Sequence, residues 1–302
     1  MPLFQKILVT GSTGFVGRVV RRTWPDVVIF PRDVDLSDAD EVTNKLQEIY
    51  TETPFQAVLH LAAQSSPQVS KKNVLETWRV NTLGTIHLTR ALDSIAWEGR
   101  FLFVSTGAVY GNLRGTITEQ SPVNLSSPYV ASKLAAELAT LEWGQRSGNW
   151  VTVARPFNHS GAGQSSHYFL PSMASQISSL GLEGGVIEVG NLGVHRDFSH
   201  VRDIVSAYRA LLERGRNQET YNLASGISST LAKILDSLAK KSGRRVDYKI
   251  VPERFREENL EEMIVNTEKI RNHTGWNIQF GLDSMLDELT KEWMTPKCQK
   301  KH

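Results

Sequence analysis

Short apolar segments of the length of buried strands alternate with helical patterns along the first half of the chain. The apolar segments lie at residues 6–10, 27–30, 57–61, 101–104 and 151–154, and the helical patterns lie near 38–49, 73–93 and 129–147. A strand, a crossover helix and a second parallel strand form a right-handed unit in which the helix packs on the sheet. The alternation therefore predicts an α/β fold, a doubly wound parallel sheet with helices on both faces.

Three glycines follow the first apolar segment, at the point where a helical pattern starts. Gly11, Gly14 and Gly17 allow a tight turn, close approach of the backbone to a pyrophosphate, and close packing of helix on strand. The N-terminus of the helix that follows also favours phosphate binding. The segment predicts a dinucleotide-binding Rossmann domain, with cofactor contacts from Gly11, Thr13, Gly14, Phe15, Val16 and Gly17.

The carboxyl ends of the predicted strands indicate where ligands bind, because ligands of doubly wound sheets lie outside these ends. The third apolar segment ends at Leu61, the fourth is followed by Ser105 and Thr106, and the fifth by residues 155–158. We therefore expect cofactor contacts at this edge from Leu61, Ala62, Ala63 and Arg155.

Tyr129 and Lys133 form a candidate acid/base pair. Ser126, Ser127 and Pro128 predict a helix start, so two residues four apart share one helix face. A lysine cation beside a phenol favours the phenolate and lowers its pKa from about 10 toward neutral pH. Tyr129 could then protonate a carbonyl oxygen as hydride reaches its carbon. Taken alone, the pair is also consistent with a solvated helix face; the glycine motif in the same domain favours the catalytic interpretation.

Six segments occur in the order found in one enzyme family and span nearly the whole chain. They are TGSTGFVG at 10–17, HLAAQ at 60–64, VNTLGT at 80–85, STGAVYG at 105–111, YVASK at 129–133 and RPFN at 155–158. The chain thereby resembles the extended short-chain dehydrogenases/reductases that act on nucleotide sugars. The resemblance implies that Tyr129 is the acid/base, that Lys133 also holds the nicotinamide ribose, and that Thr106 bonds the reacting oxygen of the sugar. It further implies that Asn81 shapes the cofactor site from behind.

Two positions distinguish reaction types within that family. The 4,6-dehydratases carry a glutamate, often preceded by aspartate, where this chain has Ala108 and Gly107. Neither of these side chains can move a proton, so dehydration lacks its usual acid/base pair. The remaining residues suffice for hydride transfer to or from a carbonyl, which favours a reductase or, as the alternative, an NAD-dependent sugar-nucleotide 4-epimerase. A third possibility is a catalytically idle cofactor-binding relative.

The C-terminal third narrows the expected substrate. Residues 155–164 and 190–198 are most similar to family members that reduce GDP-4-keto-6-deoxy-D-mannose to GDP-D-rhamnose. By that resemblance Asn158 and Arg196 contact the sugar diphosphate, and Arg254 or Arg256 supplies a further phosphate ligand, since a guanidinium can bind phosphate through two hydrogen bonds. The other expected substrate contacts are Gln64, Thr106, Gly107 and Ala108.

The residues after the second apolar segment bear on the choice of cofactor. An acidic residue here usually binds the adenosine ribose hydroxyls, whereas an arginine accommodates a 2′-phosphate. Arg32 and Asp33 compete for this role, and Asp35 with Leu36 resembles the adenine-contacting pair of the family. Because Arg32 comes first after the strand, NADPH is the favoured cofactor, with NADH possible.

Composition and the remaining motifs exclude some functions. A net charge of +2 without an arginine-rich run argues against nucleic-acid binding, no metal-ligand spacing occurs, and no apolar stretch approaches the roughly 20 residues of a membrane helix. A single cysteine, Cys298, and no signal-peptide pattern make cytoplasm the expected location. We expect a dinucleotide-binding domain of residues 1–155 plus 191–223, and a small C-terminal substrate-binding lobe of residues 156–190 plus 224–302. The resemblance implies a homodimer paired through the helices near 73–93 and 129–147.

Overall fold

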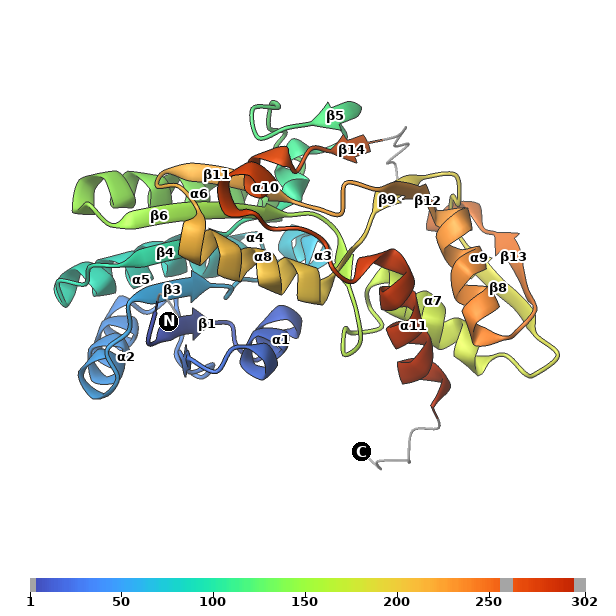
Figure 1. Ribbon diagram of the computed structural model, residues 1–302, viewed down its shortest axis with the longest axis horizontal. Coiled ribbons are helices and arrows are strands. Elements are labelled where there is room, and N and C mark those ends of the chain that lie inside the picture. The colour runs from blue at the N-terminus through green and yellow to red at the C-terminus, as the bar shows by residue number, and fades with distance from the viewer. Residues whose placement is uncertain (1–3, 256–262, 296–302) are drawn as a thin grey trace.

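The centre of the molecule is a six-stranded parallel sheet with strand order β11-β6-β4-β3-β1-β2 (Figure 1). The computed structural model describes residues 4–255 and 263–295. The six strands are β1 (Ile7–Thr10), β2 (Val27–Ile29), β3 (Ala57–His60), β4 (Arg100–Val104), β6 (Trp150–Pro156) and β11 (Glu219–Leu223). The predicted doubly wound α/β fold is thus confirmed.

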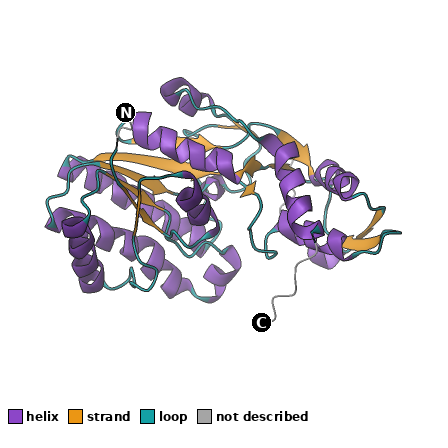
Figure 2. Ribbon diagram, turned by 60° about the horizontal axis from the view of Figure 1, so that its bottom comes forward, coloured by secondary structure: helices purple, strands orange, loops and turns teal. Residues whose placement is uncertain are grey.

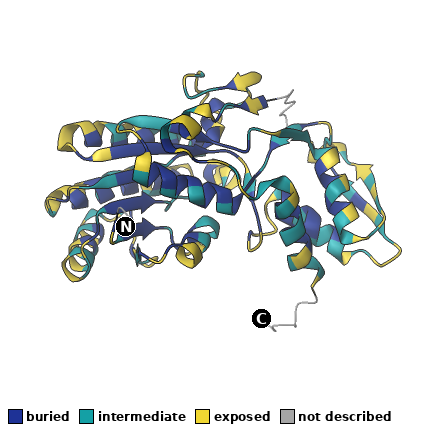
Figure 3. Ribbon diagram, in the orientation of Figure 1, coloured by how far each residue is buried: buried dark blue, intermediate teal, exposed yellow. Residues whose placement is uncertain are grey.

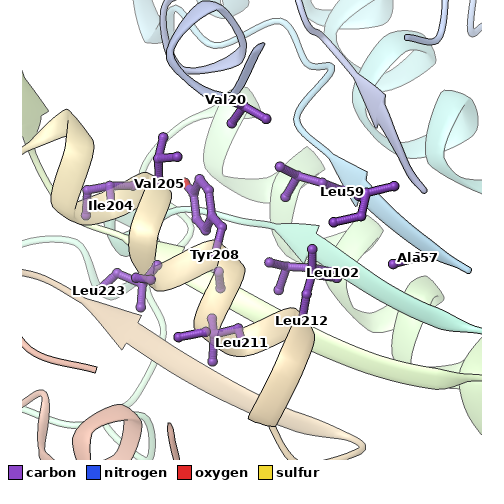
Figure 4. Close-up of a cluster of buried hydrophobic side chains, with 14 of the residues drawn as sticks. Val20, Ala57, Leu59, Leu102, Ile204, Val205, Tyr208, Leu211, Leu212 and Leu223 are labelled. Atoms are coloured by element: carbon purple, nitrogen blue, oxygen red, sulfur yellow. The ribbon is translucent and has the colours of Figure 1, made fainter. Parts of the chain in front are cut away.

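Helices cover both faces of the sheet, as Figure 2 shows. One face packs against α2 (Ala39–Glu52), α5 (Gly84–Ser94) and α6 (Pro128–Ser147), and the other against α1 (Phe15–Thr23) and α8 (Val201–Arg214). Side chains of a strand alternate between the faces: Leu8 joins the α2 side, while Ile7 and Val9 join the α8 side. Figure 4 shows the α8 side, where Tyr208 and Leu211 pack near Leu102 and Leu59. Both faces of the central strands are therefore buried (Figure 3).

The helical pattern near 73–93 forms three consecutive pieces instead of one helix. They are α4 (Val74–Trp78), a π-helical turn η1 (Arg79–Leu83) and α5, preceded by the short α3 (Pro67–Lys72). Single π turns inside helices are frequent at functional sites, and Asn81 lies in this one. The predicted start of α6 is confirmed: Ser127 caps it by accepting from the Val130 N–H at 3.3 Å, and Pro128 is its first residue.

A smaller lobe with its own apolar core follows the sheet (Figure 1). Its core is formed by α7 (Phe169–Ser179), α9 (Leu231–Ser242), α11 (Gly281–Met294) and the parallel pair β8 (Gly185–Val189) and β13 (Val246–Ile250). Three further strand pairs join the two parts: β5 (Gly115–Ile117) with β14 (Met263–Val265), β7 (His159–Ser160) with β10 (Ser199–His200), and β9 (His195–Asp197) with β12 (Ser228–Thr230). The short helices η2 (Gly107–Tyr110) and η3 (Pro252–Arg254) complete the elements named here.

One segment assigned to the lobe from sequence packs elsewhere. Helix α10 (Glu268–Thr274) contacts α8 and β11, and its Ile270 is buried with Trp276 in the core on the α8 side of the sheet. The chain therefore returns to the first part between α9 and α11.

Candidate active site

Two glycines of the motif, Gly11 in the turn between β1 and α1 and Gly17 in α1, are packed too closely to carry a side chain. Gly11 has φ of +69°, and a Cβ on it would lie 2.7 Å from the Ala62 nitrogen. A Cβ on Gly17 would lie 2.3 Å from the Gly11 oxygen. Helix α1 starts at Phe15 after Gly14, which provides no side-chain cap, so the first N–H groups of the helix can serve a phosphate. The turn fits the diphosphate of a dinucleotide.

A cavity of about 400 Å³ adjoins this turn. It is lined by residues 11–13, by the loop 30–36, and by Ala62, Glu76 and Val80. The cavity thus brings together six of the expected cofactor residues, namely Gly11, Thr13, Arg32, Asp35, Leu36 and Ala62. Glu76 and Val80 were not expected there; they come from α4 and η1, whose distance from the glycine turn in the sequence hides their proximity.

Of the two candidate catalytic side chains of α6, Lys133 is buried and Tyr129 is partly buried. Lys133 is buried, with its ammonium 4.3 Å from the centre of the Phe103 ring, and burial lowers its pKa to about 7 although Glu137 opposes the change. Burial raises the pKa of Tyr129 to about 12; a hydrogen bond with Thr106 opposes this rise and the phenol of Tyr168 adds to it. The sequence-based direction for the Tyr129 pKa was therefore wrong, because desolvation outweighs any effect of the lysine charge.

Thr106 and Tyr168 reach Tyr129 from two different parts of the chain. Thr106 precedes η2, where its hydroxyl accepts from the Ala108 N–H at 3.2 Å, and its side chain hydrogen-bonds Tyr129. Tyr168 lies at the N-terminus of α7 and is 46% exposed. Sequence reasoning missed Tyr168, because no motif spacing connects the loop before α7 with the end of β4.

Buried polar side chains form a chain of hydrogen bonds that starts at Thr10 on β1. Burial, helped by the Lys133 charge, lowers the pKa of His60 to about 3, so its ring is neutral. The Thr10 hydroxyl, which accepts from the Ala62 N–H at 3.1 Å, can donate to His60 Nδ1 at 2.7 Å. His60 Nε2 then donates to Thr85 Oγ1 at 3.0 Å, whose hydroxyl donates to the Asn81 carbonyl at 2.7 Å. This chain ties β1 and β3 to the π turn.

Asn81 continues the chain to α6. Its Nδ2 donates to the Gln64 carbonyl at 3.1 Å and to Ser132 Oγ at 3.0 Å, and its Oδ1 accepts from the Gln64 N–H at 2.8 Å. Ser132 in turn donates to the Tyr129 carbonyl at 2.8 Å. Asn81 is buried, and its side chain links the loop after β3 to α6.

Gly107 and Ala108 leave the dehydratase positions without a carboxylate, and Gly107 is also sterically restricted. A Cβ on Gly107 would lie 2.6 Å from Cδ2 of Phe157. The Phe157 ring is stacked on Tyr110 with centroids 5.9 Å apart and an angle of 10° between the planes. Ala108, by contrast, is exposed.

Arg155 lies beneath this stack and not in the cofactor cavity. Its guanidinium pairs with the buried Glu137 carboxylate through two bonds, at 2.5 and 3.2 Å, and donates to the Tyr110 hydroxyl at 2.7 Å. The Tyr110 hydroxyl donates to Asn222 Oδ1 at 2.8 Å. These bonds give Arg155 a structural role, and we leave it out of the cofactor site proposed below.

The expected substrate residues outside the segment 106–108 come from several different parts of the fold. Gln64 and Asn158 lie at carboxyl ends of sheet strands; Gln64 Oε1 is buried without a partner among the described residues, and Asn158 Nδ2 donates to the Asp197 carbonyl at 3.4 Å. Arg196 lies on β9 and donates to the His195 carbonyl at 2.9 Å. Arg254 is on the lobe surface, paired with Glu188 at 3.0 Å. Arg256 lies outside the described residues.

Neither a metal-ligand cluster nor a membrane-spanning helix occurs among residues 4–255 and 263–295. No group of three or more histidine, cysteine, aspartate or glutamate side chains within them is arranged to hold a metal ion. None of the helices within them combines the length and the apolar character that crossing a membrane requires.

Comparison with known proteins identifies the family. The profile of the family described as GDP-mannose 4,6 dehydratase matches residues 21–289. GDP-6-deoxy-D-mannose reductase of Pseudomonas aeruginosa is 34% identical over 303 residues, which cover 96% of this chain and 97% of that protein. GDP-6-deoxy-D-talose 4-dehydrogenase of Aggregatibacter actinomycetemcomitans is 29% identical over 299 residues, 95% and 97% of the two chains.

A solved structure agrees with these sequence relatives. The structure of RMD from Pseudomonas aeruginosa complexed with NADPH superposes with a TM-score of 0.87 at 32% identity, over 96% of this chain and 99% of that one. The family expected from the sequence motifs is thereby confirmed. The chain belongs to the GDP-mannose 4,6-dehydratase family of extended short-chain dehydrogenases/reductases.

Proposed function

We propose that this protein is a reductase that uses NADPH, or less readily NADH, to reduce the 4-keto group of GDP-4-keto-6-deoxy-D-mannose, giving GDP-D-rhamnose. The observation that carries the proposal is the hydrogen bond between Thr106 and Tyr129, with Lys133 one turn along the same helix and no carboxylate at positions 107 and 108. The 34% identity to a GDP-6-deoxy-D-mannose reductase supports the choice of a GDP-linked 6-deoxy sugar.

The cofactor supplies the hydride when bound, and the residues of the chain supply a proton and fix the geometry. Tyr129 donates its phenolic proton to the sugar O4 as that oxygen gains negative charge. Thr106, which contacts Tyr129, holds the same oxygen by a hydrogen bond. Lys133, with a pKa of about 7, can be cationic or neutral near neutral pH; its cationic form stabilises the phenolate that remains.

We propose a division of labour between the two parts that keeps the sequence-based boundaries with one exception. We propose that residues 1–155 and 191–223 hold the cofactor, with Arg32 beside the 2′-phosphate, and that residues 156–190 and 224–302 hold the sugar nucleotide. The exception is α10, which packs against α8 and β11. Asn158 and Arg196 are the proposed sugar-diphosphate contacts. Gln64, whose buried Oε1 has no partner among the described residues, is a further proposed substrate contact, since an amide oxygen can accept from a sugar hydroxyl.

We propose a homodimer formed through α4 and α6, which contact each other in the monomer. Large apolar side chains are exposed on this surface, among them Leu75 (74%), Leu138 (60%) and Trp78 (37%). Replacing both leucines by glutamate would place charge in the proposed interface. Light scattering after gel filtration should then give a dimer mass for wild type and a monomer mass for the variant; a monomeric wild type would contradict the proposal.

The reaction itself is tested by mixing the protein with NADPH and the 4-keto-6-deoxy sugar nucleotide made in situ from GDP-mannose, and in parallel from dTDP-glucose. We expect nicotinamide absorbance to fall with the GDP substrate and the Tyr129→Phe variant to be inactive, with product stereochemistry read by NMR. No cofactor oxidation with either substrate would refute the proposal. Tightly bound NAD with epimer formation and no net oxidation would instead identify a 4-epimerase.

A further inference from the structure

The loop segment between β6 and α7, which includes the short strand β7, is held from two sides at Gly163. The Gly163 N–H donates to both carboxylate oxygens of Glu292 on α11, at 3.0 Å each. The Gly163 carbonyl accepts from Nη2 of Arg18 on α1 at 2.8 Å. Gly163 has φ of +87°, a backbone conformation that other residues rarely adopt. The two helices that hold it belong to different parts of the molecule.

Arg18 also reaches the glycine-rich turn. Its Nη1 donates to the Thr13 carbonyl at 2.9 Å, so one guanidinium joins Thr13 to Gly163. The rings of Phe15 and His159 form a second contact between the same two segments, stacked with centroids 6.3 Å apart and 7° between their planes. A guanidinium suits this bridge because its donors form a rigid fork, whereas a lysine ammonium is a compact charge on a flexible stem.

The loop transmits this contact to Asn158 because it is internally bonded. Ser160 Oγ donates to Gln164 Oε1 at 2.7 Å, and Gln164 Nε2 donates to the His159 carbonyl at 3.2 Å. The Asn158 carbonyl accepts from the Ser199 N–H at 2.9 Å. Displacing Gly163 would therefore disturb the backbone that carries Asn158, a proposed contact of the sugar diphosphate.

We propose that Arg18 is a positioning residue that couples the binding of the dinucleotide to the binding of the sugar nucleotide. The inference rests on the proposed function. A diphosphate at the N-terminus of α1 restrains Thr13 and Phe15. Through Arg18 and His159 it also restrains the loop that carries Asn158, so the second nucleotide meets a smaller ordering cost. Coupling of this kind is reciprocal, so the sugar nucleotide strengthens dinucleotide binding by the same factor.

The test measures the dissociation constant of GDP by calorimetry, with and without saturating NADP+. Wild type should bind GDP about fivefold or more tightly when NADP+ is present. In Arg18→Ala this ratio should fall to about one, and Arg18→Lys should be intermediate because a lysine cannot reproduce the fork. Arg22→Ala, an exposed arginine one turn along the same helix, should keep the wild-type ratio.

A second variant removes the contact of Gly163 with α11. Glu292→Ala releases the Gly163 N–H and should also lower the ratio, while thermal unfolding stays close to wild type because Arg18 and Gly163 are exposed. A ratio of one in wild type, or a wild-type ratio in Arg18→Ala, would overturn the proposed coupling but not the proposed function. Failure to bind either nucleotide would overturn the proposed function, and the coupling with it.

Discussion

The packing of Gly107 against Phe157 makes substitution of this glycine costly. In Gly107→Ala the new methyl group would lie 2.6–2.8 Å from three atoms of the Phe157 ring. The ring cannot easily move away, because it is stacked on Tyr110, whose hydroxyl is bonded to Arg155 and Asn222 at 2.7 and 2.8 Å. Overpacking of a well-filled core typically costs about 1–3 kcal/mol. We expect Gly107→Ala to lose stability in that range.

Urea unfolding of a double-mutant cycle separates this clash from other effects. Phe157→Ala alone should cost about 3–5 kcal/mol, because the ring is buried. In that background the methyl group of Gly107→Ala occupies vacated space and should cost close to nothing, giving a coupling of about 1 kcal/mol or more. Ala108→Ser, at the exposed neighbour, should stay within about 0.5 kcal/mol of wild type. An equal cost of Gly107→Ala in both backgrounds would refute the steric argument.

Three further predictions concern buried charge and cofactor choice. Burial lowers the pKa of Lys133 from 10.5 to about 7, so between these pH values the unfolded chain binds more protons than the folded one and this group makes the free energy of unfolding rise with pH. In Lys133→Met the free energy of unfolding, measured by urea titration at several pH values, should rise less steeply with pH. An unchanged slope would contradict this. Glu137→Ala leaves the Arg155 cation buried without its carboxylate and should cost about 3–5 kcal/mol in urea unfolding, whereas a loss below about 1 kcal/mol would count against the pair. Arg32→Ala should raise the KM for NADPH about tenfold or more and leave that for NADH unchanged, since only NADPH carries a 2′-phosphate for the guanidinium; parallel changes would exclude this role.

The sheet and its covering helices could be predicted because the strands that form its centre are continuous apolar runs. Such runs are typical of strands buried on both faces, and β3, β4 and β6 are buried in this way. The division of the pattern near 73–93 could not be predicted. Hydrophobic periodicity shows which side of a helix is buried. A single π turn such as Arg79–Leu83 shifts this periodicity by one residue only, which is too little to detect in the sequence.

Arg155 shows how a strand boundary decides the role of a residue. The sequence-based strand ended at Ala154, which made Arg155 a loop residue at the ligand-binding edge. In the structure β6 continues to Pro156, so Arg155 keeps the strand alternation and points, like Val153, to the face covered by α6. Glu137 on α6 is its partner there. Buried ion pairs of this kind depend on tertiary contacts that spacing alone does not encode.

The residues of the candidate site also divide into those that the sequence could predict and those that it could not. The residues of local motifs, such as Gly11 and Gly17, could be predicted because their role follows from backbone geometry within one turn. Tyr168 and Glu76 could not, because each comes from a distant segment that only folding brings to the site. The Tyr129 pKa was misjudged for a related reason. Spacing predicted a charged neighbour but not the burial that raises the pKa to about 12.

The most direct test of the proposed reaction follows the hydride itself. The protein would be supplied with NADPH deuterated at the transferring position of the nicotinamide C4, together with GDP-4-keto-6-deoxy-D-mannose, and the product examined by NMR. The account predicts one deuteron at C4 of the sugar, an equal amount of NADP+, and neither with Tyr129→Phe. A reduced sugar without deuterium at C4, or label that stays on the nicotinamide while the sugar is consumed, would contradict it.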